Sequence, residues 1–178
     1  MDQPVENVIG RCPRSHRSAE RIAIHAPSAL GDCKVEYIVV GGAAAIAHGS
    51  AWLTQHLDIV YRRTPGNLDR LVAALAAHKP YLRGAPAGLP FVWDRDVLRR
   101  GLNFTLITSL GDIDLLGEIP GGGTWEDLHG GSIELSVFGT SCLCLSLPQL
   151  IRAKMAAGRP KDLEALAELE TIQEERGE

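Results

Sequence analysis

A glycine pair, Gly41-Gly42, is the first feature of this sequence that suits phosphate chemistry. It follows the β-branched and aromatic run 35–40 and precedes the alanine-rich stretch 43–48, a pattern typical of a strand that turns directly into a short helix. Glycines at such a turn leave the backbone N–H groups uncovered, so an anionic triphosphate can bind there. The alternative interpretation is a plain turn, which is the commoner role of such a pair.

Side chains that can bind a metal ion occur with two-residue spacing on two expected strands further along the chain. His56 and Asp58 lie on one strand, and Asp112 and Asp114 lie on the other; alternation puts each pair on one face. Aliphatic residues flank Asp58 and Asp114, where a carboxylate is costly without a cationic partner. We therefore predict a site for Mg²⁺ (or Mn²⁺) with Asp58, Asp114 and Asp112 as ligands. The alternative for each aspartate is a solvated position at a strand edge.

A lysine near the C-terminus is predicted to supply positive charge to the same site. Lys154 continues the i, i+3, i+4, i+7 spacing of the apolar residues that begins at Leu147, so its side chain is expected to point inward. Its anionic partner would be one of the site aspartates or a bound phosphate; the alternative is a lysine that reaches solvent at the rim. Arg159 and Lys161 follow the same helix and either bind phosphates or cap the last helix.

The elements that must position these residues define an α+β (mixed α/β) fold: a mixed β-sheet flanked by helices, with two further helices at the C-terminus. The segment 80–101, rich in proline and glycine, is expected to be a loop with one or two helical turns near 94–100. The expected strands are 35–40, 57–61, 103–108, 112–116 and 133–138, and the expected helices are 43–48, one that begins at Pro65, 147–157 and 160–174.

Length and composition indicate one folded domain. The 178 residues are 45% hydrophobic and 22% charged, which is close to an average globular protein. We predict a poorly structured N-terminal extension over 1–33 and one domain over 34–178 that includes the C-terminal helices. The four cysteines are expected to be reduced thiols.

Charge and hydropathy limit the partners that the sequence predicts. The formal net charge of −4 provides no global field for nucleic acid, so an RNA partner would need a local patch, for which Trp93, Arg95, Arg99 and Arg100 are candidates. The alternative for these four is ordinary loop packing. The sequence contains no apolar run of the length that spans a bilayer, and we therefore expect a cytoplasmic protein without a membrane partner.

Several of these features occur in the order seen in a known superfamily. They are Gly41-Gly42, the helix end 47–50, the strand start His56-Leu57-Asp58, the strand 111–116, and the C-terminal segments 150–154 and 158–162. In this order they resemble the DNA polymerase β-like nucleotidyltransferases. The resemblance is closer to the small bacterial nucleotidyltransferase-like proteins related to toxin–antitoxin and abortive-infection systems, and it covers roughly residues 35–172.

The resemblance implies a function and a role for each site residue. The implied reaction transfers a nucleoside monophosphate from an NTP to a hydroxyl of an RNA, protein or small-molecule acceptor, with loss of pyrophosphate. The catalytic, metal-holding positions map to His56, Asp58 and Asp114, and the NTP contacts map to Gly41, Gly42, Lys154, Arg159 and Lys161.

One position departs from the family pattern. His56 stands where the family has its first metal-holding aspartate, and a neutral imidazole suits zinc or copper better than Mg²⁺. The alternative prediction is therefore a catalytically weakened relative that binds nucleotide or a cognate partner protein as a regulatory component.

Overall fold

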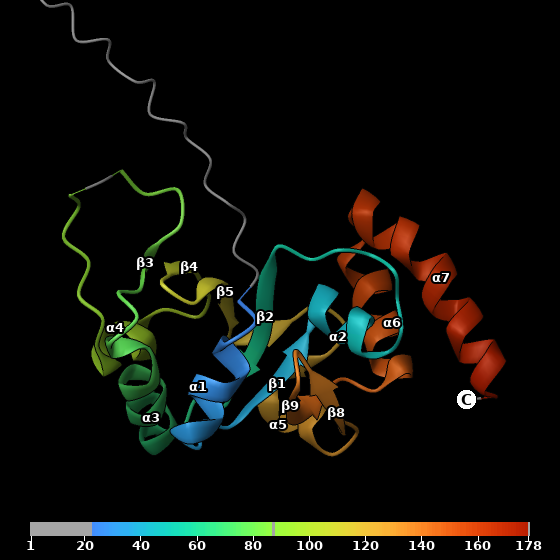
Figure 1. Cartoon of the computed structure of the whole chain (residues 1–178), viewed down its shortest axis with the longest axis horizontal. Coiled ribbons are helices and arrows are strands. Elements are labelled where there is room, and N and C mark those ends of the chain that lie inside the picture. Colours follow the sequence, from blue (N-terminus) through green and yellow to red (C-terminus); the bar gives the residue numbers. More distant parts are fainter. Residues whose placement is uncertain (1–22, 87, 178) are drawn as a thin grey trace, which may run out of the picture.

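The centre of the molecule is a seven-stranded mixed sheet, described here from a computed structural model that covers residues 23–86 and 88–177. The strands run in the order β3-β4-β5-β2-β1-β9-β8 (Figure 1). Strands β6 and β7 form a separate two-stranded sheet. Their bounds are β1 Tyr37–Val40, β2 His56–Tyr61, β3 Tyr81–Leu82, β4 Phe104–Thr108, β5 Gly111–Leu116, β6 Glu118–Ile119, β7 Gly123–Thr124, β8 Ile133–Val137 and β9 Thr140–Cys144.

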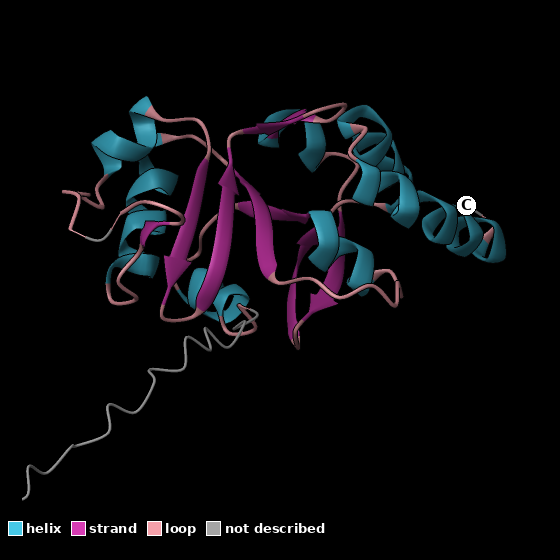
Figure 2. Cartoon of the chain, turned by 90° about the horizontal axis from the view of Figure 1, so that it is seen from above, coloured by secondary structure: helices cyan, strands magenta, loops and turns pink. Residues whose placement is uncertain are grey.

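Helices flank this sheet, which confirms the predicted mixed α/β fold. Helices α3 and α4 lie at the β3–β4 end, and α6 and α7 lie at the opposite end of the molecule (Figures 1 and 2). None of the helices in the described part of the chain is long and apolar enough to cross a membrane. The helix bounds are α1 Ala26–Asp32, α2 Gly41–Ala47, α3 Pro65–Ala76, α4 Arg95–Arg100, α5 Trp125–His129, α6 Leu147–Ala157 and α7 Pro160–Arg176.

Strand β2 lies at the middle of the sheet and fixes the register of the residues that matter for chemistry. It pairs antiparallel with β1 and parallel with β5, and β5 pairs antiparallel with β4. The aliphatic residues Leu57, Ile59, Ile113 and Leu115 are fully buried. Burial of these side chains holds the register, because a slip of one residue would turn them to the opposite face.

Segment 26–32, which the sequence analysis placed in the poorly structured extension, instead forms helix α1. Leu30 is fully buried, and the hydroxyl of Tyr37 in β1 donates to the Pro27 carbonyl at 3.3 Å. A proline in the first turn suits a helix start because its missing N–H would have no partner there. Residues 1–22 of the predicted extension lie outside the described residues.

Residues 80–101 contain the predicted helical turns as α4. They also contain the short strand β3, which was not predicted. The indole of Trp93 donates to the Val72 carbonyl at 3.1 Å, and Arg95 pairs with Asp69 at 3.2 Å. Two members of the candidate RNA patch therefore take part in packing and ion pairing between α3 and the segment around α4.

The cysteines in the described residues are thiols. Cys33, Cys142 and Cys144 are free, as predicted, and Cys12 lies outside the described part. Burial raises the pKa of the Cys144 thiol to about 12, so this side chain is an uncharged core residue at neutral pH.

A buried asparagine on α3, Asn67, bridges the backbone just before β1 and just after β2. Its replacement gives a test of the fold. Asn67 is fully buried; its amide accepts from the Glu36 N–H at 2.7 Å and donates to the carbonyls of Glu36 and Arg62 at 2.9 and 2.8 Å. We expect Asn67→Ala to lower the free energy of unfolding by about 2 kcal/mol, because the backbone groups lose buried partners.

Urea denaturation of Asn67→Ala beside Asp69→Ala would measure this effect. Asp69 lies on the same helix but is exposed, and its ion pair with Arg95 should contribute less than about 1 kcal/mol. Equal losses in both variants would contradict the bridging role of Asn67.

Candidate functional site

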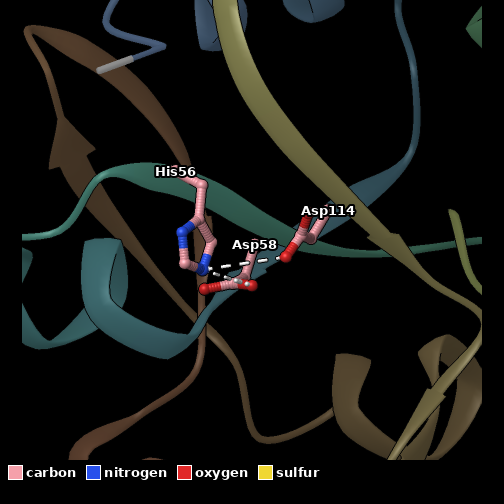
Figure 3. Close-up of side chains that lie close together, drawn as sticks. All are labelled: His56, Asp58 and Asp114. Atoms are coloured by element: carbon pink, nitrogen blue, oxygen red, sulfur yellow. Dashed lines mark ion pairs between the residues drawn. The ribbon is translucent and has the colours of Figure 1, made fainter. Parts of the chain in front are cut away.

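Three side chains from two neighbouring strands, β2 and β5, meet on one face of the central sheet. The Nε2 atom of His56 lies 3.4 Å from Oδ1 of Asp58 and 3.7 Å from Oδ2 of Asp114 (Figure 3). One ligand atom from each of the three residues lies within 4.8 Å of the others. Asp58 and Asp114, which the sequence predicts for one site, therefore face one another on adjacent strands.

The parallel register of β2 and β5 produces this meeting. Asp58 stands directly opposite Asp114, and His56 stands opposite Asp112. Residues at i and i+2 share a face of a strand, so His56 joins the two carboxylates that face it. The aliphatic neighbours on the opposite face are buried and keep the polar side chains on this one.

The predicted glycine pair lies against the site. Gly41 has a φ of +62°, and a Cβ at this position would overlap the carboxylate of Asp58. A Cβ at Gly42 would lie 2.7 Å from Oγ1 of Thr54, whose hydroxyl donates to the His56 carbonyl at 2.9 Å. Glycine is therefore required at Gly41 both by its backbone conformation and by the close approach to Asp58. The predicted binding of a triphosphate to this turn stays a prediction.

The pKa values of His56 and Asp114 are both raised above their ordinary values. Contact with the Asp58 carboxylate raises the pKa of the His56 imidazole above its ordinary value, against the opposing effect of burial. Burial raises the pKa of the Asp114 carboxyl, and hydrogen bonds from Arg83 counteract this in part. The cluster thus combines an imidazole and a carboxyl group whose pKa values both lie above their ordinary values.

Arg83 is the site residue that the sequence analysis missed. Its Nη2 atom donates to both carboxylate oxygens of Asp114, at 2.6 and 2.8 Å, and its Nη1 atom donates to Oδ2 of Asp112 at 3.2 Å. Asp112 was predicted as a metal ligand, but it is turned toward this guanidinium and is absent from the group of three. The one available signal was charge balance, because three aspartates on one face of two adjacent strands need cationic partners.

Lys154 points inward as predicted, but its partner differs from the predicted ones. Its Nζ atom lies 3.3 Å from Oδ1 of Asp162, whose side chain is 3% exposed. Gly158 ends α6 in a left-handed conformation, with a φ of +61°, and this turn brings the first residues of α7 back against Lys154. Asp162, rather than Asp58 or Asp114, is thus the carboxylate partner of Lys154, and a contact with bound phosphate stays a prediction.

Arg159 and Lys161, the other two predicted phosphate contacts, lie in different surroundings. Arg159 caps the start of α7 and donates through Nε to Oδ2 of Asp162 at 2.5 Å. The hydrogen bond to Asp162 raises the pKa of Arg159, and the charge of Asp58 adds to this effect, so the guanidinium lies within electrostatic reach of the site. Lys161 is exposed on the following turn.

The donor set decides which cation the site would fit. The imidazole nitrogen and two carboxylate oxygens are close enough for one divalent ion to contact all three, and the absence of a Cβ at Gly41 leaves the Asp58 carboxylate uncrowded. Mg²⁺ prefers an all-oxygen shell, whereas Mn²⁺ and Zn²⁺ accept nitrogen. The residues fit one ion of the second kind. A clamp of two Mg²⁺ ions would need a further carboxylate, and Asp112 is committed to Arg83.

Comparison of the chain with protein-family models and with curated proteins finds no match. The superfamily resemblance therefore remains an expectation that rests on the residues themselves. The site geometry, however, stands independently of that resemblance. It is a face of two parallel strands that presents one imidazole and two carboxylates beside a glycine with positive φ.

Proposed function

We propose that this chain is a metal-dependent nucleotidyltransferase that transfers a nucleoside monophosphate from an NTP to a hydroxyl group, with Mn²⁺ favoured over Mg²⁺. One observation carries the proposal: Asp58 and Asp114 stand in register on adjacent parallel strands, next to Gly41, a position that only glycine can occupy. The preference for Mn²⁺ follows from the nitrogen ligand that His56 would contribute.

Each site residue has a part in the proposed transfer. Asp58, His56 and one oxygen of Asp114 would hold the cation, which would supply positive charge to neutralise the phosphate oxygens. Asp114 accepts the proton of the attacking hydroxyl, a role that suits a carboxylate whose pKa is raised by burial. The hydroxyl oxygen forms a bond to the α-phosphorus, the bond from that phosphorus to the bridging oxygen breaks, and pyrophosphate leaves.

The second candidate is a regulatory protein that binds nucleotide, or a cognate partner protein, without transfer. The observation that favours it is the ion pair of Asp114 with Arg83, in which both carboxylate oxygens accept hydrogen bonds from the guanidinium. If this ion pair persists when nucleotide is bound, Asp114 cannot accept a proton from an acceptor.

Incubation with NTPs labelled at the α-phosphate tests the proposal directly. We expect label to enter total tRNA, the protein itself or a small-molecule hydroxyl in Mn²⁺, and Asp58→Asn to reduce the rate at least about 100-fold, since even indirect supports of a metal commonly cost that much. Asp69→Asn, the same change at an exposed aspartate on α3, is the matched control and should leave the rate unchanged.

The outcomes separate the two candidates. Binding of Mn²⁺ and nucleotide that depends on Asp58, without label transfer to any acceptor, would favour the regulatory protein. Label transfer that Asp58→Asn and Asp69→Asn support equally would refute the proposed site.

A further inference from the structure

Arg83 occupies a position in which a side chain can move while the backbone stays fixed. Its N–H donates to the Thr105 carbonyl at 2.9 Å, which continues the pairing of β3 with β4 by one residue. Gly84 follows with a φ of +80° and turns the chain away from the sheet. The Arg83 side chain is 29% exposed, and its guanidinium reaches over β4 to the aspartates of β5. Movement of this group needs only rotation of the side chain.

The guanidinium already takes the oxygens that a metal ion would share. Both oxygens of Asp114 accept from its Nη2 atom, and one of these oxygens, Oδ2, also lies 3.7 Å from the His56 ring. A divalent ion between Asp58 and Asp114 would therefore compete with Arg83 for the same carboxylate and would repel it at short range. The hold of Arg83 on Asp114 must weaken when the ion binds, whereas its contact with Asp112 is independent of that position.

The other two cationic side chains discussed for the site, Lys154 and Arg159, do not pair with a ligand of the proposed ion. Lys154 and Arg159 are both committed to Asp162, a buried carboxylate that is not a ligand of the proposed ion. Arg83 is paired with the metal ligand itself, so metal binding releases its charge at the place where the phosphates must lie. A planar guanidinium with several N–H donors binds phosphate oxygens as well as it binds a carboxylate.

Resting on the proposed function, we infer that Arg83 exchanges partners: it is the counter-ion of Asp114 in the metal-free protein and a ligand of the triphosphate in the metal–nucleotide complex. Asp112 anchors the guanidinium in both states. The exchange also frees both oxygens of Asp114 from Arg83, one for the cation and one for the proposed part of Asp114 in the transfer. It therefore resolves the conflict between the ion pair seen in the structure and the proposed role of that carboxylate.

The exchange predicts that one substitution changes two affinities in opposite directions. Arg83→Gln should bind Mn²⁺ alone at least about tenfold more tightly, because a competing positive charge is removed from Asp114. It should bind an ATP analogue with a methylene group between the α- and β-phosphorus about tenfold or more weakly in the presence of Mn²⁺, since a charge-assisted hydrogen bond is lost. Electron paramagnetic resonance of free Mn²⁺ and calorimetry with the analogue measure the two affinities.

Two further variants make the test specific. Arg83→Lys keeps the charge without the planar fork, so its affinity for Mn²⁺ alone should stay near that of the unaltered protein while nucleotide affinity recovers in part. Arg95→Gln removes an arginine that pairs with Asp69 away from the site and should change neither affinity.

Each result bears on the inference. If Arg83→Gln leaves both affinities unchanged or lowers both, Arg83 is a structural ion-pair residue and the exchange is refuted; the proposed function survives if Asp58→Asn abolishes Mn²⁺ binding. If the unaltered protein binds no Mn²⁺, the proposed function and the exchange both fail.

Discussion

Replacement of Asp162 by asparagine should lower the free energy of unfolding by about 3 kcal/mol, the lower end of the range for breaking a buried ion pair. Asp162 is 2% exposed and receives Lys154 and Arg159 at the junction of α6 and α7. An amide cannot neutralise these two cations, and Lys154 is itself nearly buried. The loss stays at the lower end because Arg159 is mostly exposed and water can solvate it.

Thermal denaturation gives the measurement, with an expected fall in Tm of about 10 °C for a chain of this size. Glu164→Gln makes the same carboxylate-to-amide change two residues further along α7, at an exposed position, and should lie within about 0.5 kcal/mol of the unaltered protein. A fall in Tm that is equal in the two variants would show that Asp162 does not hold the helix junction.

The pH dependence of this effect has a definite sign. Burial opposes ionisation of Asp162, but the hydrogen bond and charge of Arg159 and the charge of Lys154 outweigh it, so its pKa lies below the ordinary value of 3.8. A depressed folded-state pKa contributes stability that is fully present above the unfolded-state pKa and is lost as pH falls through the folded-state pKa. The difference between the unaltered protein and Asp162→Asn should therefore be constant near neutral pH and shrink below about pH 4.

The face shared by Asp58 and Asp114 was predictable because it depends on local rules. Alternation fixes which side chains share a face of a strand, and the aliphatic neighbours of each aspartate indicate which face is buried. The helix that starts at Ser146 was predictable for the same reason, since its capping box with Gln149 is written in four consecutive residues.

The partners of Arg83 and Lys154 were not predictable because they depend on how separate elements meet. Arg83 lies 31 residues from Asp114 and reaches it only because the two-residue strand β3 pairs with β4. Lys154 meets Asp162 because of the left-handed turn at Gly158, and helix periodicity gives the direction of a side chain but not the residue that it will meet. Long-range pairing of this kind follows from tertiary packing rather than from sequence spacing.

Replacement of His56 by aspartate should convert the site from one that favours Mn²⁺ to one that binds Mg²⁺, with Mg²⁺ affinity increased about tenfold or more, equivalent to at least about 1.4 kcal/mol. The imidazole of His56 stands between Asp58 and Asp114, within 3.7 Å of both carboxylates. An aspartate at this position would complete an all-oxygen set and remove the nitrogen ligand, whose pKa the hydrogen bond to Asp58 raises above its ordinary value.

Metal-dependent thermal stability reads out this change without any assumption about the acceptor. In the absence of metal the aspartate variant should melt earlier than the unaltered protein, because a third carboxylate joins Asp58 and Asp114 without an added cation. Mg²⁺ should then raise its Tm more than it raises that of the unaltered protein, since a ligand that binds only the folded state stabilises it in proportion to the logarithm of its concentration over Kd.

The matched control is His78→Asp, which adds the same charge at a histidine whose ring contacts Ser109 near the β4–β5 turn. It should show no gain in Mg²⁺ affinity by calorimetry. Mg²⁺ binding by His56→Asp that is equal to or weaker than that of the unaltered protein would place His56 outside the metal site. The two carboxylates would then have to bind a cation without a ligand from the start of β2, and the preference for Mn²⁺ would lose its physical basis.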